Sequence, residues 1–343
     1  MAGVKSDRTS PGAQGSASRP LAFTAVCLGV FAVILDTTIV NVALPAIGRS
    51  FHATVTDPRW AVNGYSIVFA TLLLTFGALS DRRGGKRAFG SGTVVFVTGS
   101  LVCALAPSIP VLLAGRVVQG FGAALLMPAW LALIAHTYPE PTARTRAVAA
   151  WAAWAGAAFA SGPVVGGVLV DQLGWRAIFL VNLPVGATAL ALLLRYATDT
   201  ATTPRRVDPP GQVLAIVVLA AAAFGITEAG AYGWLAVFTT VPLIVAVVAF
   251  VAIERKVEAP LLPPSLFAHR SFSAATGVGL LLNFGICGQV FVLSLYLQDI
   301  RQFSALTTGL MLLPFAGLTM ILPPVTGRSP RASAPATSWS SGS

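Results

Sequence analysis

Two charged side chains stand inside long apolar runs of the sequence, where a charge is costly. Asp36 lies in the stretch LDTTIVNVALP, and Arg116 lies in LLAGRVVQGFGAA. A buried carboxylate favours its protonated form unless a partner or water compensates the charge. Asp36 is therefore a candidate proton carrier. The alternative is a polar residue near a helix end that hydrogen-bonds to Thr37, Thr38 or Asn41.

Arg116 is the one basic residue within an apolar run, so we expect it to face the interior of a helix bundle and not lipid. Gln119 and Gly120 follow at helical spacing and share its face. Such a set can couple a proton to a conformational change, or it can be a buried hydrogen-bonding and packing node. The residues by themselves leave both interpretations open.

The elements that must position these residues are helices in a bilayer. Of the 343 residues, 55% are hydrophobic and 10% are charged, and the mean hydropathy is +0.79, far from the averages of soluble proteins. A bilayer crossing takes about 20 apolar residues. The sequence therefore predicts an all-α integral membrane protein with ten transmembrane helices, at residues 21–46, 60–80, 88–106, 111–135, 147–170, 177–194, 211–229, 234–253, 272–297 and 306–325.

The net charge of +10 would suit nucleic acid if the basic residues formed one surface, but they follow the predicted spans instead. With the N-terminus in the cytoplasm, 17 of the 22 Lys and Arg residues lie on the cytoplasmic side and four on the other side. An excess of basic residues in cytoplasmic loops is typical of membrane topology. We therefore expect a multi-pass protein of the inner (cytoplasmic) membrane with a cytoplasmic N-terminus, and no nucleic-acid partner.

The segment GALSDRRGGKR, residues 77–87, places four basic residues and one acid between two apolar runs. A short loop carrying topology charges explains the basic residues, but it does not explain Gly77, Asp81 and Gly84. Glycines permit a tight turn and a close helix approach. An acid at a helix end can meet a basic side chain or the positive terminus of a neighbouring helix. Such a contact can open and close.

This loop resembles the pattern G-x-L-a-D-r-x-G-r-k of the major facilitator superfamily, with departures at Ser80 and Gly85. LDTTIVNVALP, LLAGRVVQGFGAA, SGPVVGG and GWRAIFLVNLPVG narrow the resemblance to the drug:proton antiporter branch with fourteen predicted helices. The resemblance implies three sets of functional residues. They are a conformational latch (Gly77, Asp81, Arg82, Gly84 and Lys86), a proton-coupling or substrate site (Asp36, Asn41, Arg116 and Gln119) and a helix-packing motif that controls leak and rocking (Gly162, Pro163, Gly166 and Gly167).

The same resemblance implies proton-driven export of drugs or other small amphiphilic molecules by alternating access, without a cofactor. An acid in the central cavity favours cationic substrates. A non-transporting or regulatory membrane fragment is one alternative, and a membrane enzyme is another. The enzyme is disfavoured because no nucleophile, base and metal-ligating residues are grouped, and no G-x-x-x-x-G-K-[ST] motif for nucleotides occurs.

The domain organisation follows from the spans and from changes in composition. We predict a polar, disordered cytoplasmic tail, a first six-helix bundle, a cytoplasmic linker, two extra linker helices, the start of a second bundle and an aberrant polar tail, at residues 1–20, 21–196, 197–210, 211–255, 256–325 and 326–343. The last 18 residues contain six serines and cannot form a span. We expect a truncated form of a longer transporter that inserts into the membrane but does not complete a transport cycle; a genuine ten-helix protein is the alternative.

Overall fold

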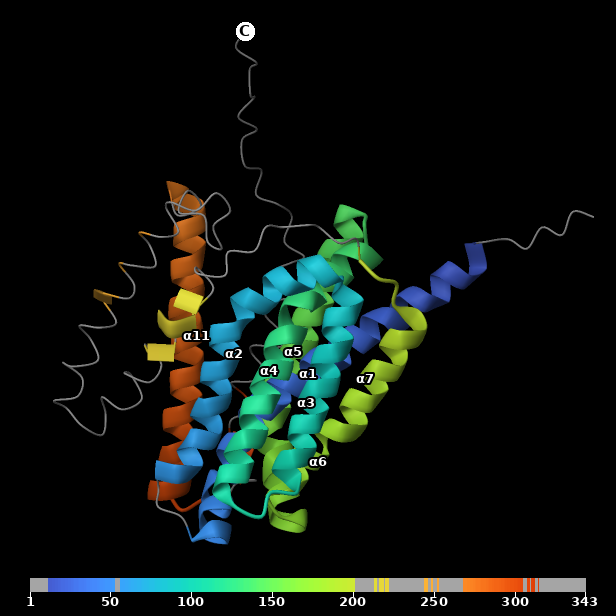
Figure 1. Ribbon diagram of the computed structural model, residues 1–343. Coiled ribbons are helices and arrows are strands. Elements are labelled where there is room, and N and C mark those ends of the chain that lie inside the picture. Colours follow the sequence, from blue (N-terminus) through green and yellow to red (C-terminus); the bar gives the residue numbers. More distant parts are fainter. Residues whose placement is uncertain are drawn as a thin grey trace, which may run out of the picture.

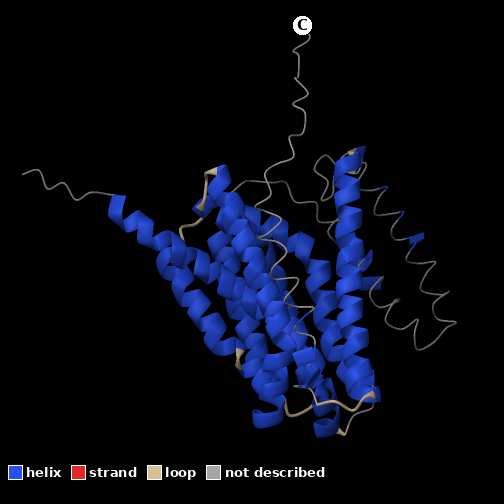
Figure 2. Ribbon diagram, turned by 180° about the vertical axis from the view of Figure 1, so that it is seen from behind, coloured by secondary structure: helices blue, strands red, loops and turns tan. Residues whose placement is uncertain are grey.

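The computed structural model describes residues 12–52, 56–200 and 268–304, and scattered positions between 213 and 314. Its elements in this part of the chain are all helices (Figure 2). They are α1 (Gly12–Phe51), α2 (Thr56–Arg83), α3 (Gly85–Ala104), α4 (Ile109–Thr137), α5 (Pro141–Leu173), α6 (Ala177–Leu180), α7 (Asn182–Tyr196) and α11 (Arg270–Leu295), and a π-helical turn, Tyr296–Ile300, follows α11.

Within the described residues, five helices are long and apolar enough to cross a membrane, with α6 and α7 forming one of them, Ala177–Tyr196. The number is six if α2 is counted, which bends by 55° between Trp60–Leu73 and Thr75–Arg83. These six match the first six predicted spans in order. The predicted span at 272–297 overlaps α11, whereas those at 211–229, 234–253 and 306–325 fall largely outside the described residues.

The predicted disordered tail is wrong for residues 12–20, because α1 begins at Gly12. Once a helix has nucleated, each further residue that is fixed adds one hydrogen bond. The helix of the first span can therefore continue into the polar residues that precede it. The other predicted domain boundaries stay predictions. The proposed linker beyond residue 200 and the polar tail at 326–343 lie outside the described residues.

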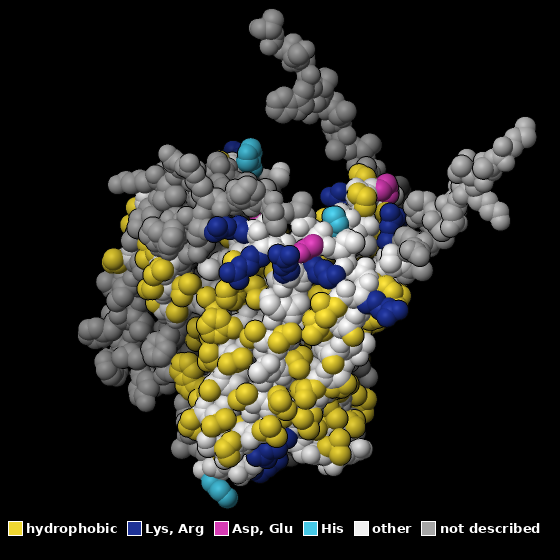
Figure 3. All heavy atoms as spheres, turned by 45° about the vertical axis from the view of Figure 1, so that its right-hand side comes forward, with side chains coloured by type: hydrophobic (Ala, Val, Ile, Leu, Met, Phe, Trp, Pro, Cys, Tyr) yellow, Lys and Arg dark blue, Asp and Glu magenta, His cyan; other side chains and the backbone are white. Residues whose placement is uncertain are grey.

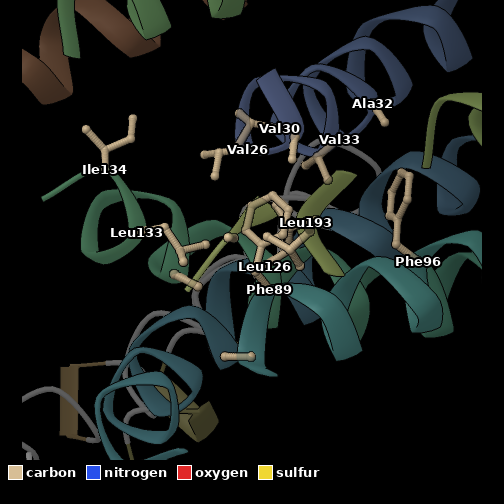
Figure 4. Packing of buried hydrophobic residues seen from close by; sticks show 14 of the residues in the cluster. Val26, Val30, Ala32, Val33, Phe89, Phe96, Leu126, Leu133, Ile134 and Leu193 are labelled. Carbon is tan, nitrogen blue, oxygen red and sulfur yellow. The ribbon is translucent and has the colours of Figure 1, made fainter. Parts of the chain in front are cut away.

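The helices α1 to α7 pack side by side, with α4 between α2 and α3, and with α1 against α5 and α7 (Figure 1). One buried apolar cluster joins α1, α3, α4 and α7 through Val30, Phe89, Leu126 and Leu193 (Figure 4). Gly29 brings α1 close to α3, because a Cβ there would lie 2.6 Å from the Phe89 ring. The core therefore depends on small residues at helix crossings.

On the face shown in Figure 3, hydrophobic side chains cover the middle of the bundle, and Lys and Arg side chains gather toward its ends, most of them at one end. This pattern matches a bundle whose middle faces lipid and whose ends face water. At one such end, Glu140 caps α5 by accepting hydrogen bonds from the backbone N–H groups of Thr142 and Ala143. Hydrogen bonds from Thr142 and Ala143 lower the pKa of the Glu140 carboxyl, since they favour its charged form.

Candidate functional site

The Asp36 carboxylate lies fully buried at the meeting point of several helices. Its Oδ2 accepts a hydrogen bond from the Arg116 guanidinium at 2.5 Å, and the two side chains form an ion pair. Its Oδ1 accepts from the side-chain amides of Gln119 at 3.1 Å and Asn182 at 2.9 Å. Asp36 and Gln119 have no exposed surface, and Arg116 has 1%. The carboxylate of α1 is thus held by two residues of α4 and one of α7.

The Arg116 guanidinium contacts residues of three helices. Nε donates to the Ala61 carbonyl oxygen of α2 at 2.7 Å, and one terminal nitrogen donates to both Asp36 and Gln119. The Tyr65 ring of α2 lies over the guanidinium, with its centroid 4.2 Å from Cζ. A desolvated cation gains from such a ring face as well as from its hydrogen bonds. Arg116 therefore joins α1, α2 and α4.

Two amides and a hydroxyl complete the buried cluster. Gln119 accepts from Arg116 at 2.8 Å and donates to Asp36 and to the Ser100 hydroxyl of α3, the latter at 2.6 Å. Asn182 donates to Asp36 and, at 3.3 Å, to Ser100. We call Asp36, Ser100, Arg116, Gln119 and Asn182 the polar cluster. Each of its members makes hydrogen bonds to more than one other helix.

Glycines let the helices that carry the polar cluster approach closely. A Cβ at Gly99 of α3 would lie 2.6 Å from the Gln119 backbone nitrogen of α4. A Cβ at Gly120 of α4 would lie 2.9 Å from the Tyr65 carbonyl oxygen of α2. Any larger residue would push these helices apart and lengthen the hydrogen bonds between them. The packing and the polar contacts thus depend on the same positions.

The structure brings together three of the four predicted proton-site residues and places the fourth elsewhere. Asp36, Arg116 and Gln119 are in direct contact, whereas the amide of Asn41 donates to the Thr37 carbonyl oxygen of its own helix at 3.2 Å. The alternative that Thr37, Thr38 or Asn41 satisfies Asp36 is not what the contacts show. Asn182 was not among the predicted site residues, although it lies in GWRAIFLVNLPVG, one of the stretches that carry the family resemblance.

The predicted latch residues lie where α2 ends and α3 begins. Gly84 alone separates the two helices, with a φ of +90° that favours glycine, and a Cβ there would overlap the Asp199 carboxylate. Lys86 donates to the carbonyl oxygens of Leu194 and Ala197 at the end of α7, at 3.0 and 2.6 Å. Lysine at a helix C-terminus satisfies carbonyl groups that lack a helical partner.

The start of α3 also donates hydrogen bonds to the residues that follow α7. Thr200 Oγ1 accepts from the Gly85 backbone N–H at 2.6 Å, and Asp199 accepts from the Lys86 backbone N–H at 3.3 Å. Asp199 also pairs with Arg87 at 3.4 Å. The chain leaving α7 thus caps the start of α3. Of the other latch residues, Gly77 faces Pro128 of α4, Asp81 is partly buried, and Arg82 is exposed.

The predicted packing motif lies on α5 against α1, close to the polar cluster. Gly162, Pro163, Gly166 and Gly167 are all buried. A Cβ at Gly162 would overlap the Thr38 hydroxyl and lie 2.7 Å from Thr38 Cβ. A Cβ at Gly166 would lie 2.8 Å from Ile39 Cγ1. Thr38 follows Asp36 by half a turn, so the position of α5 limits how α1 can turn or tilt there.

Chemically, the polar cluster can exchange a proton but offers no set for covalent chemistry. Among the described residues, no group of three or more His, Cys, Asp and Glu side chains could hold a metal ion. The buried carboxylate, by contrast, can take up a proton, and doing so would release the arginine from its ion pair. The α1 and α4 helices would then lose the ion pair between them.

One family model matches most of the length of the chain, and this match decides the family. A model of the Major Facilitator Superfamily matches residues 26–334. The chain belongs to the major facilitator superfamily. This confirms the resemblance and the all-α membrane fold predicted from the sequence, and it makes the chain a multi-pass membrane protein.

Several proteins similar to this chain are named for drug or antibiotic resistance. The methylenomycin A resistance protein of Streptomyces coelicolor is 42% identical over 294 residues, which cover 85% of this chain and 62% of that protein. The multidrug resistance protein Stp of Mycobacterium tuberculosis is 39% identical over 311 residues, 90% of this chain and 58% of Stp. The tetracenomycin C resistance and export protein of Streptomyces glaucescens is 36% identical, over 92% of this chain and 60% of its own. The chain therefore spans about three fifths of the length of these relatives.

Solved structures of transporters share the fold of this major facilitator protein. A peptide transporter POT in complex with sulfate has a TM-score of 0.62 at 16% identity, covering 90% of this chain and 67% of its own. The human organic anion transporter MFSD10 has a TM-score of 0.57 at 17% identity, covering 92% and 73%. At such identities the likeness concerns the fold alone.

Proposed function

We propose that this major facilitator protein exports small amphiphilic molecules, such as antibiotics, in exchange for protons. The observation that carries the proposal is the Asp36–Arg116 ion pair, which is fully buried and joins α1 to α4. A buried pair that loses one charge leaves the other uncompensated, so a proton on Asp36 changes the energy of the whole contact. The resistance and export proteins that the chain resembles support the same function.

In the proposed cycle, a proton from outside neutralises Asp36 and Arg116 is released from its ion pair. Arg116 keeps the Ala61 carbonyl and the Gln119 carbonyl as acceptors, so its charge stays hydrogen-bonded while α1 and α4 separate. The two states then differ in which helices are tied together, as alternating access requires. Gly162 and Gly166 provide the surface on which α1 moves, and the latch residues hold one end of α2 and α3. No cofactor takes part.

The N-terminus is proposed to lie in the cytoplasm and the protein in the inner membrane, because this orientation places most of the basic residues on the cytoplasmic side. The charged carboxylate favours cationic substrates, which would compete with the proton and with Arg116 for Asp36. If the substrate leaves Asp36 when the proton binds, substrate and proton move in opposite directions, and this competition alone couples the two movements.

The test is export of a cationic drug by the purified chain in liposomes under an imposed pH gradient. We expect gradient-driven export by the parent, a result that would overturn the expectation of an inactive truncated form. We expect none above background in Asp36→Asn, since the amide cannot carry a proton. Asp171→Asn, the same exchange at an exposed acid of α5, is the matched control and should export like the parent. Full proton-driven export by Asp36→Asn would remove Asp36 from the mechanism.

A further inference from the structure

Asn182 has an unused hydrogen-bonding atom beside the carboxylate. Its side chain has no exposed surface, and its Nδ2 donates to Asp36 Oδ1 at 2.9 Å and to Ser100 Oγ at 3.3 Å. Its Oδ1 is buried as well, and no described residue donates a hydrogen bond to it. A buried polar atom without a partner is uncommon and calls for an explanation.

The other amide of the polar cluster differs in this respect. Gln119 uses both ends, because Oε1 accepts from Arg116 at 2.8 Å while Nε2 donates to Asp36 and Ser100. Turning the Gln119 amide would place its NH₂ group against the guanidinium, donor against donor. Turning the Asn182 amide breaks no hydrogen bond of its Oδ1, which has none, but it gives up the two hydrogen bonds that Nδ2 donates to Asp36 and Ser100. That loss is unfavourable beside a charged carboxylate and is offset only when Asp36 carries a proton to donate. The terminal torsion of asparagine is broad and roughly two-fold, so both orientations are accessible.

Resting on the function proposed above, we propose that Asn182 is a positioning residue whose amide turns when Asp36 takes up a proton. In the charged state, Nδ2 donates to the carboxylate oxygen. In the protonated state, the new O–H group of Asp36 needs an acceptor, and the turned amide presents Oδ1 at that place. The Ser100 hydroxyl can follow, because a hydroxyl donates as readily as it accepts. The proton comes from the aqueous phase and returns to it, and no other bond changes.

The surroundings of Asp36 leave few other acceptors for this proton. The titratable or charged groups that act on it are Tyr65 from α2, Cys103 from α3 and Arg116 from α4. The α5 helix faces α1 with the backbone of Gly162 and Gly166. Arg116 can only donate, and Gln119 keeps its Oε1 on the guanidinium. Of the described side chains that hydrogen-bond to Asp36, Asn182 is therefore the one whose amide can serve both states of the carboxyl.

Infrared spectroscopy of the purified chain during an acid titration tests this inference without requiring transport. The carboxylic-acid C=O band that disappears in Asp36→Asn belongs to Asp36, and its wavenumber is lower when the acid O–H is hydrogen-bonded. We expect the hydrogen-bonded position in the parent and a shift to higher wavenumber in Asn182→Leu, which has similar volume but no polar atoms, while Gln119 still donates to the carboxyl. Thr98→Val, which removes a hydroxyl of α3 that bonds to its own helix, is the control and should leave the band unchanged.

The outcomes separate the two proposals. A band at the free-acid position in the parent itself would overturn the role of Asn182, whether or not the leucine variant folds. The same band position in the parent and in a folded Asn182→Leu would overturn it too. If no band in the parent depends on Asp36 at any pH, Asp36 carries no proton and both proposals fail. Asn182→Leu should also reduce proton-driven export at least tenfold with an unchanged KM for the drug.

Discussion

Arg116 connects α4 to α1 and α2 through a set of contacts that a simpler cation could not make all at once. Its Nε reaches the Ala61 carbonyl, a terminal nitrogen reaches Asp36 and Gln119, and Tyr65 covers its face. The planar guanidinium provides donors in a fixed fork, whereas the lysine ammonium is a compact point charge. Substitutions at Arg116 can therefore distinguish the effect of its positive charge from the effect of its planar geometry.

We expect Arg116→Lys to retain part of the proton-driven export and Arg116→Ala to lose it. Lysine still offers Asp36 a positive charge, but alanine leaves a buried carboxylate unpaired, at a cost of about 3–5 kcal/mol in stability. Export into liposomes and thermal unfolding followed by tryptophan fluorescence measure the two effects. If both variants export like the parent, Arg116 has a structural role alone.

At the scale of the helices, α1 and α5 are in contact through residues without side-chain bulk. Gly162 meets Thr38 so closely that any Cβ must move one helix, and α1 carries Asp36 only two residues away. Overpacking of this kind costs about 1–3 kcal/mol in a tightly packed interior. A change at this crossing therefore acts on the proton site without touching a polar group.

Gly162→Ala should lower the melting temperature and slow export several-fold, while the protein still inserts into the membrane. Gly64→Ala is the matched control, because a Cβ at Gly64 of α2 meets nothing within 4 Å. That control should behave like the parent in thermal unfolding and in export. Equal behaviour of the two alanine variants would show that the α1–α5 contact is not limiting for either property.

On the scale of the whole molecule, the ends of α1 and α2 report the orientation in the membrane. Arg49 stands in the last turn of α1 and Arg83 in the last turn of α2, and both are exposed. Since a span separates them along the chain, they emerge on opposite sides. The native Cys27 and Cys103 are buried and should not react with a bulky reagent.

We expect a membrane-impermeant thiol reagent added to intact cells to label Arg49→Cys and not Arg83→Cys, with Cys287 replaced by serine in both. Inverted vesicles should give the opposite pattern, because positive charge is retained in the cytoplasm. Labelling of Arg83→Cys in intact cells would reverse the proposed orientation.

The sequence alone determined the membrane class, the six spans from α1 to α7, the likeness to the superfamily, and Asp36, Arg116 and Gln119 as candidates. These follow from hydropathy along the chain, from charges that stand out in apolar runs, and from short motifs. Such signals need only neighbours in the sequence. The helix in residues 12–20 carries no such signal, because continuation of a helix does not require apolar residues.

Only the tertiary structure decided which side chains meet. Asn182 lies 146 residues from Asp36 in the chain, and nothing in its local sequence indicates that its amide reaches the carboxylate. That contact depends on the depth and rotation of α7 in its packing against α1 and α3, and at Gly186 the backbone of α7 comes close to Val97 of α3. Likewise, Asp199 and Thr200 meet the start of α3 only because α3 and α7 pack side by side. A polar residue shows its type in the sequence, but its partner is fixed by the packing of helices distant in the chain.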